Sequence, residues 1–250
     1  MKISIVTISF NQSQFIEKCI RSVISQKDID LEYIIVDAGS TDGSREIIMK
    51  YQSSISKIIF ENDNGAADGL NKGFQNATGQ IFGFINSDDM LMPDALKKVL
   101  HFFNENKNAD VLLGRGYIID EHDRRLKYII PSQFSVRRFV TGGFRFIQQG
   151  MFFKRQAFES CHGFNSNNIT CWDGELLLDM GLADNNIICG GDDIGYFRMQ
   201  VNSITSTGKL NHQYNLEKER LFLKAMGRGR LSIDYIYNLI YLIKKMLINK

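Results

Sequence analysis

The stretch Ile81-Phe82-Gly83-Phe84-Ile85-Asn86-Ser87-Asp88-Asp89 decides the fold of this chain. Its apolar first part is typical of a strand that is buried on both faces, and the polar part follows it directly. Two adjacent carboxylates at the end of a buried strand are costly unless they bind a cation or cap a helix. The stretch therefore predicts a strand with a cation site at its carboxyl end, while a cap for a helix begun near Pro93 is the alternative.

Strands and helices alternate on both sides of this stretch. A β-branched run at residues 2–10 predicts the first strand, and Ser13 is the expected N-cap of the helix after it. Such alternation indicates βαβ units and a mainly parallel sheet, in which ligands bind at the carboxyl ends of the strands. The remaining predicted strands are 31–36, 57–61, 111–119, 127–130, 146–154 and one or two within 187–199, and the predicted helices are 13–25, 45–51, 66–76, 93–104, 172–180 and most of the C-terminal third.

Polar residues recur where the predicted strands end, and we expect them to meet along one rim of the sheet. A pair of carboxylates there suits Mg²⁺ or Mn²⁺, which proteins bind through one or two carboxylates together with substrate phosphates. The expected rim residues are Thr7, Asn11, Asp37, Ser40, Asp42, Asp63, Ser87, Asp88 and Asp89.

Two turns are candidate nucleotide contacts. Residues 37–44 read Asp-Ala-Gly-Ser-Thr-Asp-Gly-Ser, which is either simple turn chemistry or a cradle for a base and ribose. Neither a P-loop nor a dinucleotide fingerprint is present. Asp68 and Lys72 stand four apart in residues 63–73, so they form either a stabilising helical pair or, with Asp63, a nucleotide and phosphate contact.

Taken together, residues 7–11, 37–44, 61–73, 77–80 and 86–89 resemble the inverting glycosyltransferase family 2, and most closely its bacterial capsule, colanic-acid and O-antigen subgroup. The resemblance covers roughly residues 1–200. It implies a GT-A fold, in which a Rossmann-like nucleotide half (1–110) merges with an acceptor half (111–208), followed here by C-terminal helices (209–250).

The resemblance also implies roles for single residues. Thr7 and Asp37 would contact the base, with Asp42 and Asp68 near the nucleotide. Asp89 would be the direct metal ligand, and Asp88 would hold ribose or sugar. Residues 149–154 resemble the segment that begins the acceptor half, where Gln149 would bind substrate. The subgroup often has His-Gln at this point, whereas this chain has Gln148-Gln149.

The residues around Trp172-Asp173-Gly174-Glu175 resemble the acidic motif that supplies the catalytic base. Asp173 is the first candidate and Glu175 the second, while both acids also suit a helix start. The implied reaction moves a sugar from a nucleotide sugar, expected to be a UDP-sugar, to an acceptor hydroxyl with inversion. The expected acceptor is a lipid-linked oligosaccharide of bacterial surface polysaccharide synthesis. An inactive nucleotide-binding scaffold and a sugar nucleotidyltransferase are the alternatives.

Charge is unevenly distributed along the chain. The net charge is +2, but residues 209–250 carry +6 and the rest −4. The apolar run Leu239–Ile243 is too short to span a membrane, which takes ~20 residues. We expect an interfacial helix on an anionic leaflet, with Lys224, Arg228, Arg230, Lys244 and Lys245 facing headgroups, and no nucleic acid. Packing on its own domain or in a homodimer is equally open.

The location follows from the cysteines and the N-terminus. Four cysteines without a C-x-x-C pair indicate reduced thiols rather than a zinc site or a disulfide framework. The short apolar run after Met1-Lys2 is not typical of a signal peptide. We therefore expect a cytoplasmic protein, peripheral on the inner face of the plasma membrane.

Overall fold

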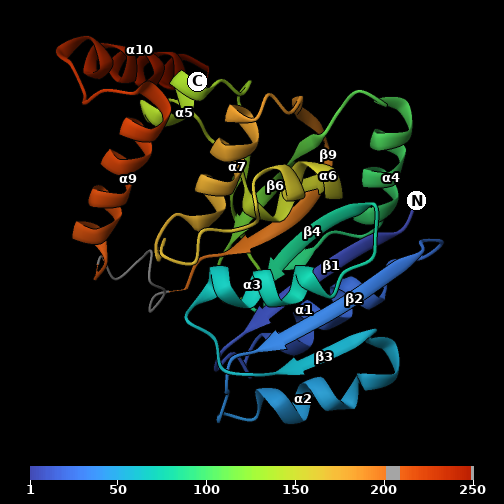
Figure 1. Cartoon of the computed structure of the whole chain (residues 1–250). Coiled ribbons are helices and arrows are strands. Elements are labelled where there is room, and N and C mark those ends of the chain that lie inside the picture. Colours follow the sequence, from blue (N-terminus) through green and yellow to red (C-terminus); the bar gives the residue numbers. More distant parts are fainter. Residues whose placement is uncertain (201–208, 249–250) are drawn as a thin grey trace.

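Four parallel strands form one half of the sheet, as the sequence predicts. The computed structural model describes residues 1–200 and 209–248, and the side chains of residues 242 and 244–248 lie outside this description. β1 (Ile3–Ser9) lies between β2 (Leu31–Asp37) and β4 (Ile81–Asn86), while β3 (Lys57–Phe60) pairs with β2 (Figure 1). The register aligns Ser9, Asp37 and Phe60 across three strands, so their carboxyl ends form one edge.

The other half of the sheet is mixed and returns to the end of β4. β8 (Met151–Lys154) pairs antiparallel with β4 and with β6 (Val111–Ile119). β6 also pairs with β7 (Arg125–Ile129) and, in parallel, with β9 (Ile187–Arg198). β5 (Met90–Leu91) follows β4 closely in sequence but pairs with β9. The end of β9 therefore lies beside residues 87–89.

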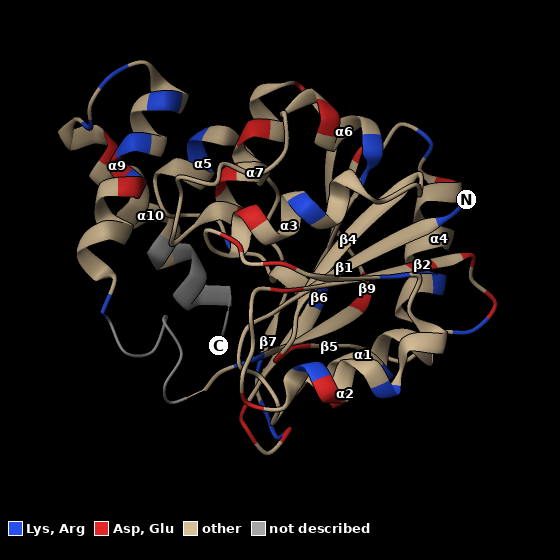
Figure 2. Cartoon of the chain, turned by 60° about the horizontal axis from the view of Figure 1, so that its bottom comes forward, with Lys and Arg blue, Asp and Glu red and all other residues tan. Residues whose placement is uncertain are grey.

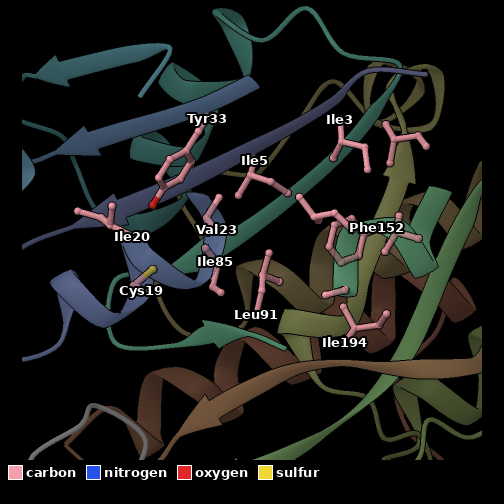
Figure 3. Packing of buried hydrophobic residues seen from close by; sticks show 14 of the residues in the cluster. Ile3, Ile5, Cys19, Ile20, Val23, Tyr33, Ile85, Leu91, Phe152 and Ile194 are labelled. Atoms are coloured by element: carbon pink, nitrogen blue, oxygen red, sulfur yellow. The ribbon is translucent and has the colours of Figure 1, made fainter. Parts of the chain in front are cut away.

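Helices cover both faces because both faces of the central strands are apolar. One core cluster joins the strands to α1 (Ile16–Ile24), α2 (Ser44–Lys50) and α4 (Ala95–Glu105), and Figure 3 shows its isoleucines around Cys19 and Tyr33. The opposite cluster joins them to α3 (Ala66–Gln75), α6 (Arg155–Ser160) and α7 (Trp172–Leu182). Short segments complete this part: η1 (Gln52–Ser54), α5 (Val136–Val140) and η2 (Gln148–Gly150).

One glycine lets a helix approach the sheet closely. A Cβ on Gly73 of α3 would collide with the side chain of Val6 in β1. α3 therefore packs nearer to the sheet than a helix with a side chain at this point could, which holds the loop before it close to the rim.

Two local predictions are wrong. The strand expected over 146–154 begins only at Met151, because residues 148–150 form a 3-10 turn whose glutamine side chains bond to β4 and its loop. Ser13 does not cap the first helix, which starts at Ile16 after an uncapped Phe15. The backbone N–H of Ser13 donates instead to Asp42.

Residues 211–248 form a helical hairpin. α9 (Asn211–Met226) runs beside α7, and α10 (Ser232–Ile248) crosses near α5 (Figure 1). Leu221 and Phe222 of α9 are buried with Leu178 of α7 and Val140 of α5. Across the described ranges, no helix is both long enough and apolar enough to span a bilayer.

Candidate active site

The loops after β1 and β2 are tied to each other at the rim. The hydroxyl of Ser40 accepts a hydrogen bond from the Asn11 N–H (2.8 Å), and the Asn11 side chain accepts from the Thr41 N–H (2.9 Å). Asp42 accepts from the N–H groups of Ser13 (2.8 Å) and Ser44 (3.0 Å). Burial raises the pKa of Asp42, but the bonds from Ser44 and Ser13 outweigh it and lower the pKa to about 2. Asn11, Ser40 and Asp42 therefore meet as predicted.

Asp37 is buried within its own turn. Its carboxylate accepts from the N–H groups of Gly39 and Ser40, from the Ser40 hydroxyl and from Arg45 Nε (2.6 Å). Burial raises the pKa of Asp37, and these bonds lower it below its ordinary value. The guanidinium of Arg45 in turn lies 4.6 Å from the centroid of the Phe60 ring. Asp37 thus shapes this turn and holds a cation and an aromatic ring at the edge.

Phe10 is an exposed aromatic residue at the same edge. It follows Ser9, which is aligned with Asp37 and Phe60, and 59% of its surface is accessible, against 38% for Phe60. Sequence reasoning missed Phe10 and Phe60, because an aromatic residue at the end of an apolar strand is normally interpreted as part of the core. It also missed Arg45.

The side chain of Thr7 lies beneath the rim rather than on it. It is fully buried, and its hydroxyl accepts from Tyr33 (3.1 Å) and lies 3.9 Å from Cys19 Sγ. The expected contact of Thr7 with a base therefore does not fit the side-chain geometry. The reason is the period of a strand, which turns the side chain of Thr7 toward Cys19 of α1.

The loop before α3 is braced by Asp63 and Asp68. Asp63 Oδ1 accepts from the Gly65 N–H (2.9 Å), and Asp68 Oδ2 accepts from the Asn64 N–H (2.9 Å). Lys72 lies 3.6 Å from Asp68 and donates to the Asn62 carbonyl. The predicted helical pair is therefore present, and burial raises the pKa of Asp63.

Asp88 and Asp89 differ sharply in accessibility. Asp89 is fully buried: Oδ1 accepts from the Arg198 N–H (2.7 Å) and Oδ2 from Gln149 Nε2. Asp88 is half-buried, and its Oδ2 accepts from Gln200 Nε2 (2.6 Å). Burial raises the pKa of both carboxyls, and the charge of Asp88 raises that of Asp89 further. The expected role of Asp89 as the direct metal ligand does not fit this geometry, whereas Asp88 is open to the rim.

Neither carboxylate caps a helix. α4 begins at Ala95, and no side chain caps its start. The alternative explanation of the acidic pair is therefore wrong. The pair is held instead by residues that lie far away in sequence.

Arg198 is the largest of these distant residues and was not predicted. Its guanidinium donates to the carbonyls of Asp88 (2.8 Å) and Asp120 (2.8 Å) and pairs with Asp123 at 2.6 Å. It also lies 4.7 Å from the centroid of Phe15. No sequence signal marked it, because an arginine at the end of a strand is ordinarily solvent-exposed.

Gln148 and Gln149 join the rim to the start of β8. Gln148 Nε2 donates to the Phe84 carbonyl (2.9 Å), and its Oε1 accepts from Gln149 (2.9 Å) and Asn86 (3.3 Å). Both glutamines are buried, so Gln149 contacts Asp89 rather than the open rim. Within the described chain, Gln149 Oε1 and Asn86 Oδ1 are buried atoms without a hydrogen-bond partner.

α7 brings a third carboxyl to this end of the sheet. The Trp172 ring lies 5.7 Å from that of Phe84 in β4, which places the neighbouring Asp173 near the end of β4. Asp173 is half-buried, and its Oδ1 accepts from the Gly174 N–H (2.8 Å). Burial raises the pKa of Asp173, although its hydrogen bonds oppose the shift.

Glu175 points elsewhere. It is buried and accepts from Arg220 Nη1 (2.7 Å) and Nη2 (2.5 Å) of α9. Burial raises the pKa of Glu175, but Arg220 and two asparagines outweigh it and lower the pKa to about 2. A carboxylate that is so fully paired is a weak base, so the geometry favours Asp173 over Glu175.

Comparison with protein-family models identifies the family of this chain. The model of glycosyl transferase family 2 matches residues 4–163. The chain belongs to this family. Among curated relatives, the putative teichuronic acid biosynthesis glycosyltransferase TuaG of Bacillus subtilis is 37% identical over 130 residues, which are 51% of this chain and 52% of that protein. The glycosyltransferase GlyG of Streptococcus pneumoniae is 31% identical over 134 residues, 52% of this chain and 44% of that protein. The chain thus aligns with about half the length of these relatives.

Solved structures show that this family 2 chain has the GT-A fold. S. aureus TarS 1-349 in complex with UDP-GlcNAc matches with a TM-score of 0.73 at 18% identity, over 95% of this chain and 69% of that one. The mannosyltransferase PcManGT of Pyrobaculum calidifontis, in complex with GDP-Man and Mn²⁺, matches with a TM-score of 0.67 at 17% identity, over 96% and 69%. The predicted family and fold are both confirmed.

The rim residues of this family 2 chain suit a metal site that substrate phosphates complete, rather than one that protein side chains enclose. The described residues contain no group of three or more His, Cys, Asp or Glu that could enclose an ion. The rim instead offers the half-buried Asp88, and Asn86 at the same strand end has a buried Oδ1 without a hydrogen-bond partner among the described residues. One carboxylate completed by substrate phosphates is the usual arrangement for Mg²⁺. The donor set therefore suits an ion that arrives with a diphosphate.

Proposed function

We propose that this chain is an inverting glycosyltransferase that moves a sugar from a nucleoside diphosphate, most simply UDP, to an acceptor hydroxyl. The observation that carries the proposal is the packing of the start of α7, which bears Asp173, against β4, the strand that leads into Asp88. Asp88 stands at the end of β4, and Asp173 stands on α7, which the contact between Trp172 and Phe84 holds against that strand. Residues 1–110 would bind the donor and residues 111–208 the acceptor.

The edge formed by β1, β2 and β3 suits the nucleoside. Phe10 and Phe60 offer exposed aromatic faces, and a base can stack on such faces. The loops that Asn11, Ser40 and Asp42 tie together would meet the ribose, and Asp63, Asp68 and Lys72 line the next loop. Asp37 would act on the base through the turn that it shapes.

Asp88 would hold Mg²⁺ or Mn²⁺ together with the diphosphate, and Ser87 lies beside it. When bound, that ion supplies positive charge against the leaving diphosphate. Asp89, Arg198 and Gln149 fix the backbone that presents Asp88. Because this geometry exists before substrate binds, little reorganisation remains for the reaction itself.

Asp173 would take the proton of the acceptor hydroxyl as general base. Burial raises its pKa, and a carboxylate with a raised pKa is a stronger base at neutral pH. The hydroxyl oxygen then forms the new bond to the anomeric carbon while the bond to the diphosphate breaks. Attack from the side opposite the leaving group inverts that carbon.

The test is release of UDP from a panel of UDP-sugars with Mn²⁺ and an acceptor. We expect Asp173→Asn to lower turnover by ~10²–10⁴-fold, the usual contribution of a general base. Wild-type turnover should fall off in acid with a midpoint above 3.8, the ordinary pKa of an Asp, because the folded protein raises that pKa. Full turnover of Asp173→Asn, or of the wild type in chelator, would overturn the corresponding assignment. UDP binding without turnover would favour an inactive scaffold. Consumption of a nucleoside triphosphate would favour a nucleotidyltransferase.

The outward face of α10 supports an acceptor at a membrane, in line with a lipid-linked saccharide. Asp234 is buried and Asn238 faces Gly142, so the polar side of α10 faces the protein. Figure 2 places the basic segments of α5 and α9 near this helix. Arg137 and Arg138 of α5 lie 3.7 Å and 5.0 Å from tyrosine rings of α10. The opposite side of α10 exposes Ile233, Tyr235, Ile236, Leu239, Ile240 and Ile243.

Not all of the expected cations take part. Lys224 pairs with Asp179 at 2.6 Å, Arg228 with Asp234 at 2.7 Å and Arg230 with Glu219 at 2.7 Å. The side chains of Lys244 and Lys245 lie outside the described residues. The proposed occupant of this face is an anionic bilayer. In a flotation assay with phosphatidylglycerol vesicles, the wild type should float with the vesicles, whereas the double variant Ile236→Ser/Ile240→Ser should stay at the bottom of the gradient. A wild-type dimer that this variant splits, without flotation of either, would identify a second copy instead.

A further inference from the structure

α9 holds the start of α7 through ion pairs to a buried carboxylate. Glu175, in the first turn of α7, accepts two hydrogen bonds from Arg220 and one from Lys224 (3.2 Å). Asn168 and Asn165 donate to the same carboxylate at 2.7 Å and 3.2 Å. Only 1% of the Glu175 side chain is exposed, so its charge depends on these partners.

A second carboxylate of α9 holds the loop that leads into α7. Glu217 is buried and accepts from the N–H groups of Ile169 (3.0 Å) and Thr170 (3.1 Å), and from the Thr170 hydroxyl. Gln213 donates to Glu217 and fixes its orientation (3.0 Å). The backbone just before Asp173 is therefore bound to α9 by direct hydrogen bonds.

The same face of α9 continues along α7. Glu217, Arg220 and Lys224 are spaced three and four residues apart, so they lie on one side of the helix. Lys224 pairs with both Glu175 and Asp179, which are one turn apart on α7. We name Glu217, Arg220 and Lys224 the α9 clamp.

Asp173 itself has little to hold it. Within the described chain, its carboxyl accepts hydrogen bonds only from N–H groups of its own helix start. Its position is therefore set by the backbone of residues 168–175, which the α9 clamp binds on both sides of it. Tyr214 of α9 also lies close enough for the charge of Asp173 to act on it: burial, then Cys171 and Asp173, raises the pKa of Tyr214.

We propose that the α9 clamp positions the general base, so that the C-terminal hairpin is part of the catalytic apparatus rather than an appended tail. This inference rests on the proposed function, because it gives the clamp the task of placing Asp173. The clamp residues are positioning residues, since they act on the reaction only through Asp173 and its backbone. Misplacement of a reacting group by ~1 Å can cost ~10²-fold in rate.

The test replaces Arg220 by Met in the full chain and uses Arg228→Met as its control. Both arginines make two hydrogen bonds to a buried carboxylate, and their side chains are 42% and 35% exposed. Arg228, however, stands in the loop after α9 and pairs with Asp234 of α10, and among the described residues it makes no hydrogen bond or ion pair with α7. By hydrogen exchange, the amides of residues 168–176 should open at least ~10-fold faster in Arg220→Met, while Arg228→Met keeps the wild-type rate there.

Turnover gives the second readout, with the UDP-sugar that the wild type uses fastest and with Mn²⁺. Arg220→Met should lower kcat by ~10- to 100-fold and change the donor KM by less than ~3-fold, because only the base is displaced. Arg220→Lys, which keeps the charge, should recover part of the loss. The acid limb of kcat should also move in Arg220→Met, since the burial that raises the pKa of Asp173 depends on the same backbone.

Two results would overturn the clamp. One is unchanged exchange of residues 168–176 in Arg220→Met, and the other is unchanged kcat in spite of faster exchange. If the single variant Asp173→Asn is inactive and the single variant Arg220→Met is fully active, the clamp proposal fails while the base assignment stands. A fully active Asp173→Asn removes the base assignment of the proposed function, and the clamp with it.

Discussion

Replacing Asp88 and Asp89 one at a time separates a ligand from a residue that supports it. Asp89→Ala leaves two buried donors, the Arg198 N–H and Gln149 Nε2, without their acceptor. Each orphaned donor costs ~1–3 kcal/mol, so the free energy of unfolding should fall by roughly 4 kcal/mol. At about 2–4 °C per kcal/mol for a chain of this size, the Tm should fall by roughly 8–16 °C. Asp88→Ala removes a carboxylate at a half-buried position, which loses the bond from Gln200, the bond from its own N–H and the attraction of Arg198, so its Tm should move by no more than ~4 °C.

The asparagine variants sharpen this contrast. In Asp89→Asn the new amide oxygen can still accept from the Arg198 N–H. Its NH₂ group can donate to Gln149 Oε1, which is buried without a partner among the described residues, if the Gln149 amide turns over. That turn gives up one bond to Gln148, which costs ~0.5–1.5 kcal/mol. Asp89→Asn should therefore resemble the wild type, whereas Asp88→Asn removes the charge that an ion would meet.

The assay pairs thermal unfolding with a Mn²⁺ titration of UDP release. We expect Asp88→Ala and Asp88→Asn to be folded without a Mn²⁺ response, Asp89→Ala to be unstable, and Asp89→Asn to be stable and responsive. The reverse pattern, in which turnover of a stable Asp89→Asn does not respond to Mn²⁺ while that of Asp88→Asn does, would show that Asp89 is the ligand.

Three further substitutions test the surroundings of the site. Arg198→Met should lower the free energy of unfolding by at least ~2 kcal/mol, because it leaves the Asp88 carbonyl without its donor and removes the bonds to the Asp120 carbonyl and to Asp123. It should also raise the Mn²⁺ concentration for half-maximal turnover, and unchanged values of both would refute its bracing role. Thr7→Val should lower the free energy of unfolding by ~1–2 kcal/mol, because it loses the bond to Tyr33. The Kd for UDP in a calorimetric titration should stay unchanged, whereas a higher Kd would support the expected contact between Thr7 and the base. Glu32→Gln should lower the free energy of unfolding by up to ~3 kcal/mol at pH 7, because four hydrogen bonds outweigh the burial of Glu32 and lower its pKa from 4.5 to about 2. This stabilisation is present above pH 4.5 and is lost as the pH falls toward 2. The free energies from urea unfolding of wild type and variant should therefore converge in acid, and a pH-independent difference would contradict the prediction.

The sequence alone determined the first half of the fold. Runs of β-branched and apolar residues fix where the parallel strands lie, because such strands are buried on both faces and tolerate few polar residues. Their alternation with helices then places the carboxyl ends on one edge. Asn11, Ser40 and Asp42 could be brought together on that argument alone, since it needs only chain order and strand direction.

Only the tertiary structure decided which polar residues are accessible and which are consumed by the protein. Adjacent Asp88 and Asp89 look equivalent in sequence, but β9 returns to the end of β4 and closes over one of them. Asp173 and Glu175 look alike in the same way, until α9 supplies Arg220 to the second. Burial and hydrogen-bond partners are properties of segments far apart in the chain. Local pattern therefore located the acids of this site, and only the packing around them could assign their work.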